Sequence, residues 1–125
     1  MKKSSNPVGW FELPVKEMKR AKAFYQQVFK VKLEVAKMGA CRMAFFAMSD
    51  KTYGTAGALV EGKDYKPSTS GVLVYFFTAD IEATLALAKE NGGRVLLPKT
   101  SIGEYGFIGW FRDCEGNRVG LHAMK

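Results

Sequence analysis

Two stretches of the chain show the same succession of hydrophobic and polar positions. Residues 8–15 form a short apolar stretch typical of a strand, and residues 17–29 carry apolar side chains at spacings of three and four, which predicts an amphipathic helix. Residues 71–78 and 80–93 repeat this order 63 positions later. Three short strand patterns follow each predicted helix. We therefore predict two copies of one βαβββ unit.

This repeat predicts an α+β fold. Each unit is expected to place one helix behind a four-stranded mixed sheet, and two curled sheets of this kind can face each other around a cavity. The first module covers residues 7–61 and the second covers residues 71–124, with a polar linker at residues 62–70. A chain of 125 residues is expected to form a single domain, residues 1–125.

Charge and composition narrow the range of partners. Residues 1–62 carry 11 Lys and Arg against 5 Asp and Glu, whereas residues 63–125 carry 8 against 7. We interpret the basic excess as a solvated lysine-rich surface, because no aromatic-interleaved basic groove accompanies it. No apolar run approaches the ~20 residues of a membrane helix. We expect a cytoplasmic protein without nucleic-acid or membrane partners, in which Cys41 and Cys114 are unreactive free thiols.

Three motifs occur in a characteristic order along the chain. They are ELPVKEMKRAKAFYQQVFKVKLE at residues 12–34, the helix end KENGG at residues 89–93, and the hairpin FRDCEGNRVGLH at residues 111–122. Together they resemble the vicinal oxygen chelate superfamily, which contains glyoxalase I, bleomycin-resistance proteins and extradiol dioxygenases. The resemblance is closest to its branch of uncharacterised proteins related to lactoylglutathione lyase. It implies two βαβββ modules around a cavity, and a homodimer.

In metal-dependent members of that superfamily, the ligands come from the first and last strands of each module. Carried over residue by residue, the resemblance places these positions at Trp10, Gly57, Leu73 and Gly120. None of these side chains can ligate a divalent metal, which needs several nitrogen, oxygen or sulfur donors. We therefore expect that the family metal site is lost, and we predict no metal and no other cofactor.

Strand alternation predicts which side chains face the cavity. If Trp10 and Gly120 face it, so do Glu12 and His122, because side chains two apart share a face. The opposite phase is wholly apolar and suits the face under the helices. The predicted ligand-binding residues are Trp10, Gly57, Tyr75, Phe77 and Gly120, and the candidate catalytic residues are Glu12 and His122.

Four roles are open for Glu12 and His122. They could form a buried structural pair, recognise a bound organic ligand, act as acid and base without a metal, or hold a displaced metal together with water. The leading function is the binding of a small organic ligand in an aromatic-lined cavity. The alternative is a lyase, isomerase or dioxygenase-type enzyme that uses these two residues with a non-standard metal or none.

One further class of function competes with these. A purely structural or regulatory protein would need an exposed apolar patch. A glutathione-like ligand is not predicted, because no arginine set is recognisable among the residues in the cavity-facing phase.

Overall fold

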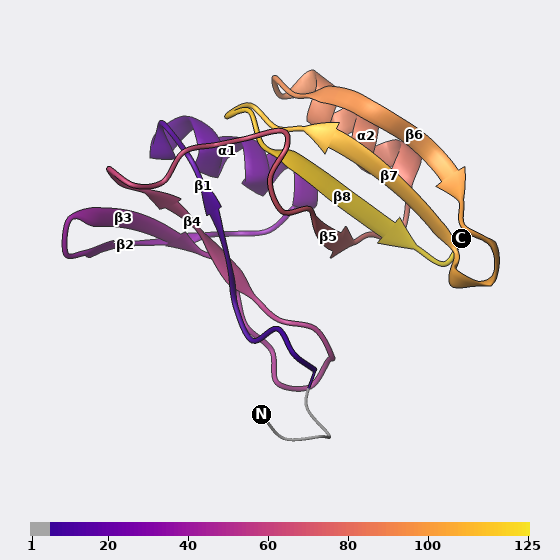
Figure 1. Cartoon of the computed structure of the whole chain (residues 1–125), viewed down its shortest axis with the longest axis horizontal. Helices are drawn as coiled ribbons and strands as arrows, with labels where there is room; N and C mark the ends of the chain where they lie inside the picture. The colour runs from indigo at the N-terminus through magenta and orange to yellow at the C-terminus, as the bar shows by residue number, and fades with distance from the viewer. Residues whose placement is uncertain (1–5) are drawn as a thin grey trace.

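The computed structural model describes residues 6–125, which form two units of the same construction (Figure 1). The first unit contains β1 (Phe11–Pro14), α1 (Met18–Phe29), β2 (Glu34–Met38), β3 (Cys41–Phe45) and β4 (Gly57–Glu61). The second contains β5 (Val74–Phe77), α2 (Ile81–Glu90), β6 (Arg94–Ser101), the short 3-10 helix η1 (Gly103–Tyr105), β7 (Phe107–Arg112) and β8 (Arg118–Ala123). The predicted repeat is therefore confirmed.

Each unit builds one four-stranded mixed sheet. The strand orders are β1-β4-β3-β2 and β5-β8-β7-β6, so the first strand of each unit forms one edge. In both sheets this first strand pairs in parallel with the last strand of its unit, while the other neighbours are antiparallel. This is the α+β architecture that the sequence predicts.

The two helices begin in different ways. Asp80 caps α2 from within its own segment, since its carboxylate accepts a hydrogen bond of 3.0 Å from the Ala83 amide. Helix α1 has no side-chain cap of its own. Instead, Glu61 of β4 accepts from the Met18 amide at 2.6 Å, and Glu115 accepts from the two amides that precede it. The start of α1 is thus fixed by tertiary contacts.

One hydrophobic core joins the two units. The buried residues of α1 and α2 pack in the same cluster as Leu13, Leu59, Phe111, Val119 and Leu121 of the strands. Phe29 of α1 stacks on Phe76 of β5, with ring centroids 4.5 Å apart. Both helices therefore cover the same side of the molecule (Figure 1), and we call the opposite side of the two sheets the open face.

The turn at residues 113–117 connects the second unit to the first through hydrogen bonds and an ion pair. Tyr25 of α1 is fully buried, and its hydroxyl donates to the Asp113 carboxylate at 2.5 Å. Asn117 donates to the Pro14 carbonyl oxygen at the end of β1, and Glu115 pairs with Arg20 at 2.5 Å. These buried polar groups satisfy one another, as groups removed from water must. The sequence predicts this turn but not its contacts.

Among residues 6–125, no helix is long and apolar enough to cross a membrane.

Candidate functional site

The exposure of the strand residues agrees with the predicted alternation. Leu13, Val119 and Leu121 are buried in the core under the helices. By contrast, Tyr75 and Phe77 are 42% and 59% exposed on the open face. These two aromatic side chains therefore lie on the exposed side of β5, as the alternation predicts.

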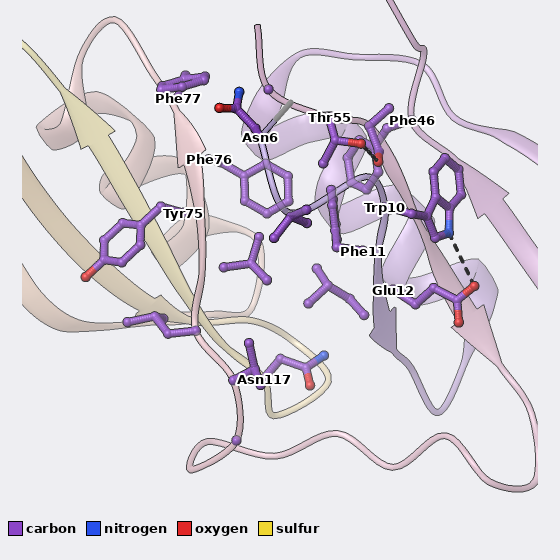
Figure 2. A pocket seen from close by; sticks show the side chains of 18 of the residues that line it. Asn6, Trp10, Phe11, Glu12, Phe46, Thr55, Tyr75, Phe76, Phe77 and Asn117 are labelled. Carbon is purple, nitrogen blue, oxygen red and sulfur yellow. Dashed lines mark hydrogen bonds between the residues drawn. The ribbon is translucent and has the colours of Figure 1, made fainter. Parts of the chain in front are cut away.

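A pocket of about 1100 Å³ lies between the edge strands β1 and β5, and we call it the seam pocket. Besides these strands, its walls come from the β3–β4 loop at residues 46–56, from the linker, and from the end of the 113–117 turn. Figure 2 shows Phe11 and Phe76 between its two sides, with Trp10 and Glu12 on one side and Tyr75 on the other. The pocket therefore lies at the junction of the two units, between the edge strands of the two sheets.

The floor of the seam pocket is aromatic. Phe11 meets Phe76 edge-on at 5.5 Å between ring centroids, and Phe46 packs within 6 Å of both. Tyr25 and Phe29 of α1 support Phe76 from the core side. Because these rings interlock with the core, the floor is a rigid apolar surface for a ligand.

Gly120 lies on the open face, as the strand alternation predicts, but the space beside it is occupied by the Tyr75 ring. A Cβ added to Gly120 would lie 2.5 Å from the ring of Tyr75, its partner across the parallel strands. The Tyr75 hydroxyl accepts a hydrogen bond of 2.8 Å from Trp110 of β7, which holds this ring in place. The position of a family metal ligand is therefore filled by an aromatic side chain.

Gly57 lies on the opposite face from the predicted one. It pairs with Phe11, and a Cβ there would lie 2.5 Å from the Phe11 ring. Since paired residues share a face, Gly57 lies on the face of Phe11, opposite to that of Trp10 and Glu12. Phe11 reaches the seam pocket from this face, but Gly57 does not line it. The residue paired with Glu12 is Ala58, which also cannot bind a metal.

Glu12 lies in the pocket wall and is held by two donors. Its carboxylate accepts from the Trp10 indole at 3.3 Å and from the Tyr65 hydroxyl at 3.0 Å (Figure 2 shows the first). The hydrogen bond to Glu12 raises the pKa of Tyr65, because a neighbouring carboxylate disfavours the phenolate. Tyr65 comes from the linker and was not predicted, since strand alternation says nothing about loops.

His122 lies on the open face, apart from Glu12. Its Nε2 is 2.6 Å from the Tyr105 carbonyl oxygen, and its ring packs near Phe77 at 6.2 Å between centroids. His122 does not line the seam pocket, and among residues 6–125 no hydrogen bond or ion pair joins it to Glu12. The hypothesis of a Glu12–His122 structural pair is therefore wrong, because each side chain has different partners.

The residues present do not fit the divalent metal of the family. The positions carried over from the resemblance hold Trp, Leu and two glycines. Within the described part of the chain, no three His, Cys, Asp or Glu side chains gather as a metal site requires. Glu12 and His122 are already hydrogen-bonded to protein groups. The donor set of this pocket therefore does not suit a divalent metal.

Arg118 is a pocket residue that the sequence interpretation missed. Its guanidinium lies over the Trp110 ring, 5.2 Å from the centroid, and it lines the seam pocket. Arg112 and Arg118 share the alternation of Gly120 and His122, so the signal was present. The expectation that no arginine set occupies the cavity-facing phase is therefore wrong.

The two cysteines are free thiols, as expected. Burial, followed by the nearby Glu115 carboxylate, raises the pKa of Cys114 to about 12. A thiol with so high a pKa is a poor nucleophile at neutral pH, which agrees with the expectation of an unreactive Cys114.

The fold and these strand positions place the chain among known proteins. Residues 8–121 match the family described as the Glyoxalase/Bleomycin resistance protein/Dioxygenase superfamily, and the chain belongs to this family. A glyoxylase-like domain-containing protein from Didymella fabae is 28% identical over 121 residues, which cover 94% of this chain and 91% of that protein.

Solved structures show the same fold. A glyoxalase I variant from Zea mays is 21% identical with a TM-score of 0.69, and the match covers 94% of this chain and 47% of that chain. A glyoxalase-related enzyme from Fulvimarina pelagi is 14% identical with a TM-score of 0.70, covering 95% of this chain and 88% of that one. The chain therefore spans about half the length of the Zea mays protein.

Proposed function

We propose that this protein binds a small organic ligand in the seam pocket, without a metal. The observation that carries the proposal is the pocket itself, about 1100 Å³ in volume, with a floor of Phe11, Phe46 and Phe76. Ligand sites in proteins have this form: an apolar, concave surface of several hundred Å³ with a few polar groups that orient the ligand.

The position of the pocket in the fold supports the proposal. Trp10 and Leu73, which the family resemblance places at ligand positions, both line it. Glu12 supplies a hydrogen-bond acceptor at one side, and Arg118 supplies donors at another. Of the roles considered for Glu12, ligand recognition fits this placement best. The enzyme alternative gains no support, because Glu12 and His122 have separate partners.

A homodimer remains part of the proposal, on the family resemblance alone. Sedimentation velocity at micromolar concentration tests it, and a single monomeric species would contradict it.

A variant that narrows the pocket tests the binding function. Val72 lines the pocket and is 89% exposed, so Val72→Trp adds bulk at the mouth without disturbing the core. Met38 of β2 is 55% exposed and lies outside the pocket, so Met38→Trp is the matched control. Both variants are screened by thermal shift and calorimetry against a library of small aromatic compounds.

We expect compounds that bind the wild-type protein and the Met38→Trp variant with equal affinity, but bind Val72→Trp at least about tenfold more weakly. The proposal fails if no compound binds the wild-type protein, or if every compound that does bind is unaffected by Val72→Trp.

A further inference from the structure

The charges of the second sheet are all of one sign. Its strands β5 to β8 contain four basic residues, Arg94, Lys99, Arg112 and Arg118, and no Asp or Glu. The near balance of charge in residues 63–125 hides this, because the acidic residues of that half lie in α2, the linker, loops and turns. Four of the eight basic residues of this half therefore lie on one sheet that carries no carboxylate of its own.

Three of these arginines form a row across neighbouring strands. Arg94 pairs with Arg112 across β6 and β7, and Arg112 pairs with Arg118 across β7 and β8. Directly paired residues lie on the same face of a sheet, and like charges in such pairs destabilise it. Among residues 6–125, the ion pairs formed all involve Arg20, so no carboxylate neutralises this row.

Arg118 connects the arginine row to the seam pocket. Its guanidinium is held over Trp110, and one terminal nitrogen donates to the Gly71 carbonyl oxygen at 3.4 Å. Its Nε is buried and has no hydrogen-bond partner, the one such side-chain atom in the described residues. A buried donor without an acceptor is costly, and a charged one more so. An anion bound at this end of the pocket would relieve that cost.

The other charged residues that line the pocket are also compatible with an anionic ligand. Lys66 also lines it, and no ion pair engages this side chain within residues 6–125. Glu12, the carboxylate in the wall, already accepts hydrogen bonds from Trp10 and Tyr65. In Figure 2, Asn117, the residue next to Arg118, lies at one end of the pocket, and Phe11 and Phe76 lie beyond it. The lining of the pocket thus combines the cationic side chains of Arg118 and Lys66 with the aromatic floor.

We infer that the ligand is an amphipathic organic anion. Its carboxylate, phosphate or sulfonate group lies at Arg118, the end of the arginine row, and its apolar body lies on Phe11 and Phe76. This inference rests on the proposed function, whose pocket it uses, and adds the chemical class of the ligand. Arginine suits this role because its planar fork binds oxyanions through charge-assisted hydrogen bonds.

Two fluorescent probes with the same body test the inference. They are 8-anilinonaphthalene-1-sulfonate, which carries an anion, and N-phenyl-1-naphthylamine, which lacks it. We expect the anionic probe to bind at least about tenfold more tightly, and Arg118→Met to abolish that difference. Raising the salt concentration should weaken the anionic probe only. Displacement by 1-naphthoate and by 1-naphthyl phosphate distinguishes a carboxylate from a phosphate preference.

The control variant removes the same charge elsewhere. Arg42→Met, on β3 of the first sheet and outside the seam pocket, should change the affinity of neither probe by more than about twofold. If circular dichroism shows that Arg118→Met does not fold, Arg112→Met replaces it, because Arg112 is the exposed member of the row paired with Arg118. We then expect a partial loss of affinity for the anionic probe.

The possible failures separate the two proposals. If both probes bind equally and Val72→Trp weakens both, the pocket function stands and the anion inference is overturned. Equal losses of the anionic probe in Arg118→Met and Arg42→Met also overturn it, because they show a general charge effect. If neither probe binds the wild-type protein, both proposals fail.

Discussion

Gly120 and Gly57 each leave room for an aromatic ring of the neighbouring strand. The absent side chain of Gly120 is replaced by the ring of Tyr75, and that of Gly57 by the ring of Phe11. Neither glycine needs an unusual backbone angle, since both have ordinary φ values. These glycines are therefore required because they leave room for the rings, and not because they allow an unusual backbone conformation. At both positions an aromatic side chain of the first strand occupies the space beside a glycine of the last strand.

The two glycines should differ in their tolerance of a methyl group. We expect Gly57→Ala to lower the free energy of unfolding by about 3 kcal/mol, and Gly120→Ala by about 1 kcal/mol. The new Cβ at Gly57 would also meet the Phe11 carbonyl oxygen, which cannot turn aside. The nearest atoms at Gly120 all belong to the Tyr75 ring, which can turn aside at the cost of its hydrogen bond from Trp110. Urea unfolding followed by circular dichroism measures both.

Gly9→Ala is the control for these substitutions, because no atom lies within 4 Å of its added Cβ. It should leave stability unchanged or slightly raise it. In a Tyr75→Ala background the cost of Gly120→Ala should disappear. An equal cost with and without the Tyr75 ring would show that the glycine has another role.

At the scale of elements, the 113–117 turn supplies the polar contacts that join the second unit to β1 and α1. Glu115 is 4% exposed and accepts from the Lys16 and Glu17 amides at the start of α1, as well as from Arg20. A carboxylate is favourable there because the helix start carries unpaired amides and partial positive charge. The turn of the second unit, together with Glu61 of β4, thus replaces the side-chain cap that the residue before α1 does not supply.

Glu115→Gln should destabilise the protein in a pH-dependent way. Burial by itself would raise the pKa of Glu115, but the hydrogen bonds from Arg20 and the two amides outweigh it, and the pKa is lowered. A lowered pKa stabilises the fold above the ordinary carboxyl pKa of about 4.3, and this contribution is lost as the pH falls further. We expect a cost of about 1.5–3 kcal/mol at pH 7 that shrinks below about pH 4.

Urea unfolding at a series of pH values measures this difference. Glu17→Gln is the control, because Glu17 is exposed and its pairing with Arg20 at 3.5 Å is a surface contact of little energy. A cost for Glu115→Gln that stays constant from pH 7 to pH 3 would contradict the assignment.

At the scale of the whole molecule, the two units share one core and cannot be separated without exposing it. Phe29 and Tyr25 of α1 pack against Phe76 of β5, and Phe24 packs against Phe111 of β7. The buried network of Asp113 and Asn117 crosses the same boundary. The sequence repeat therefore marks a structural unit but not a folding unit.

We expect residues 7–61 and residues 71–124 to remain unfolded when each is expressed alone, because each would expose the apolar surface that the other covers. The full chain should unfold in one transition that is the same by circular dichroism and by tryptophan fluorescence. Dispersed amide resonances from either isolated half would contradict this expectation, as would two separate transitions in the full chain.

The sequence by itself determined the fold class, the repeat, and the face on which Trp10, Glu12, Tyr75 and His122 lie. It could do so because the period of two in a strand and the spacing of three and four in a helix are local properties, set by backbone geometry and burial. The apolar phase of each strand was enough to identify the side under the helices, as Leu13 and Leu121 show.

Only the tertiary structure decided the register and the contacts between units. Phe11 pairs with Gly57, but its counterpart Val74 pairs with Val119, so the pairing in the two sheets differs by one residue from the sequence repeat. A shift of one residue reverses the face, which is why Gly57 was misplaced. The docking of the 113–117 turn and the separate partners of Glu12 and His122 likewise depend on residues far apart in the chain. Such contacts are selected by packing of the whole core, and no local pattern encodes them.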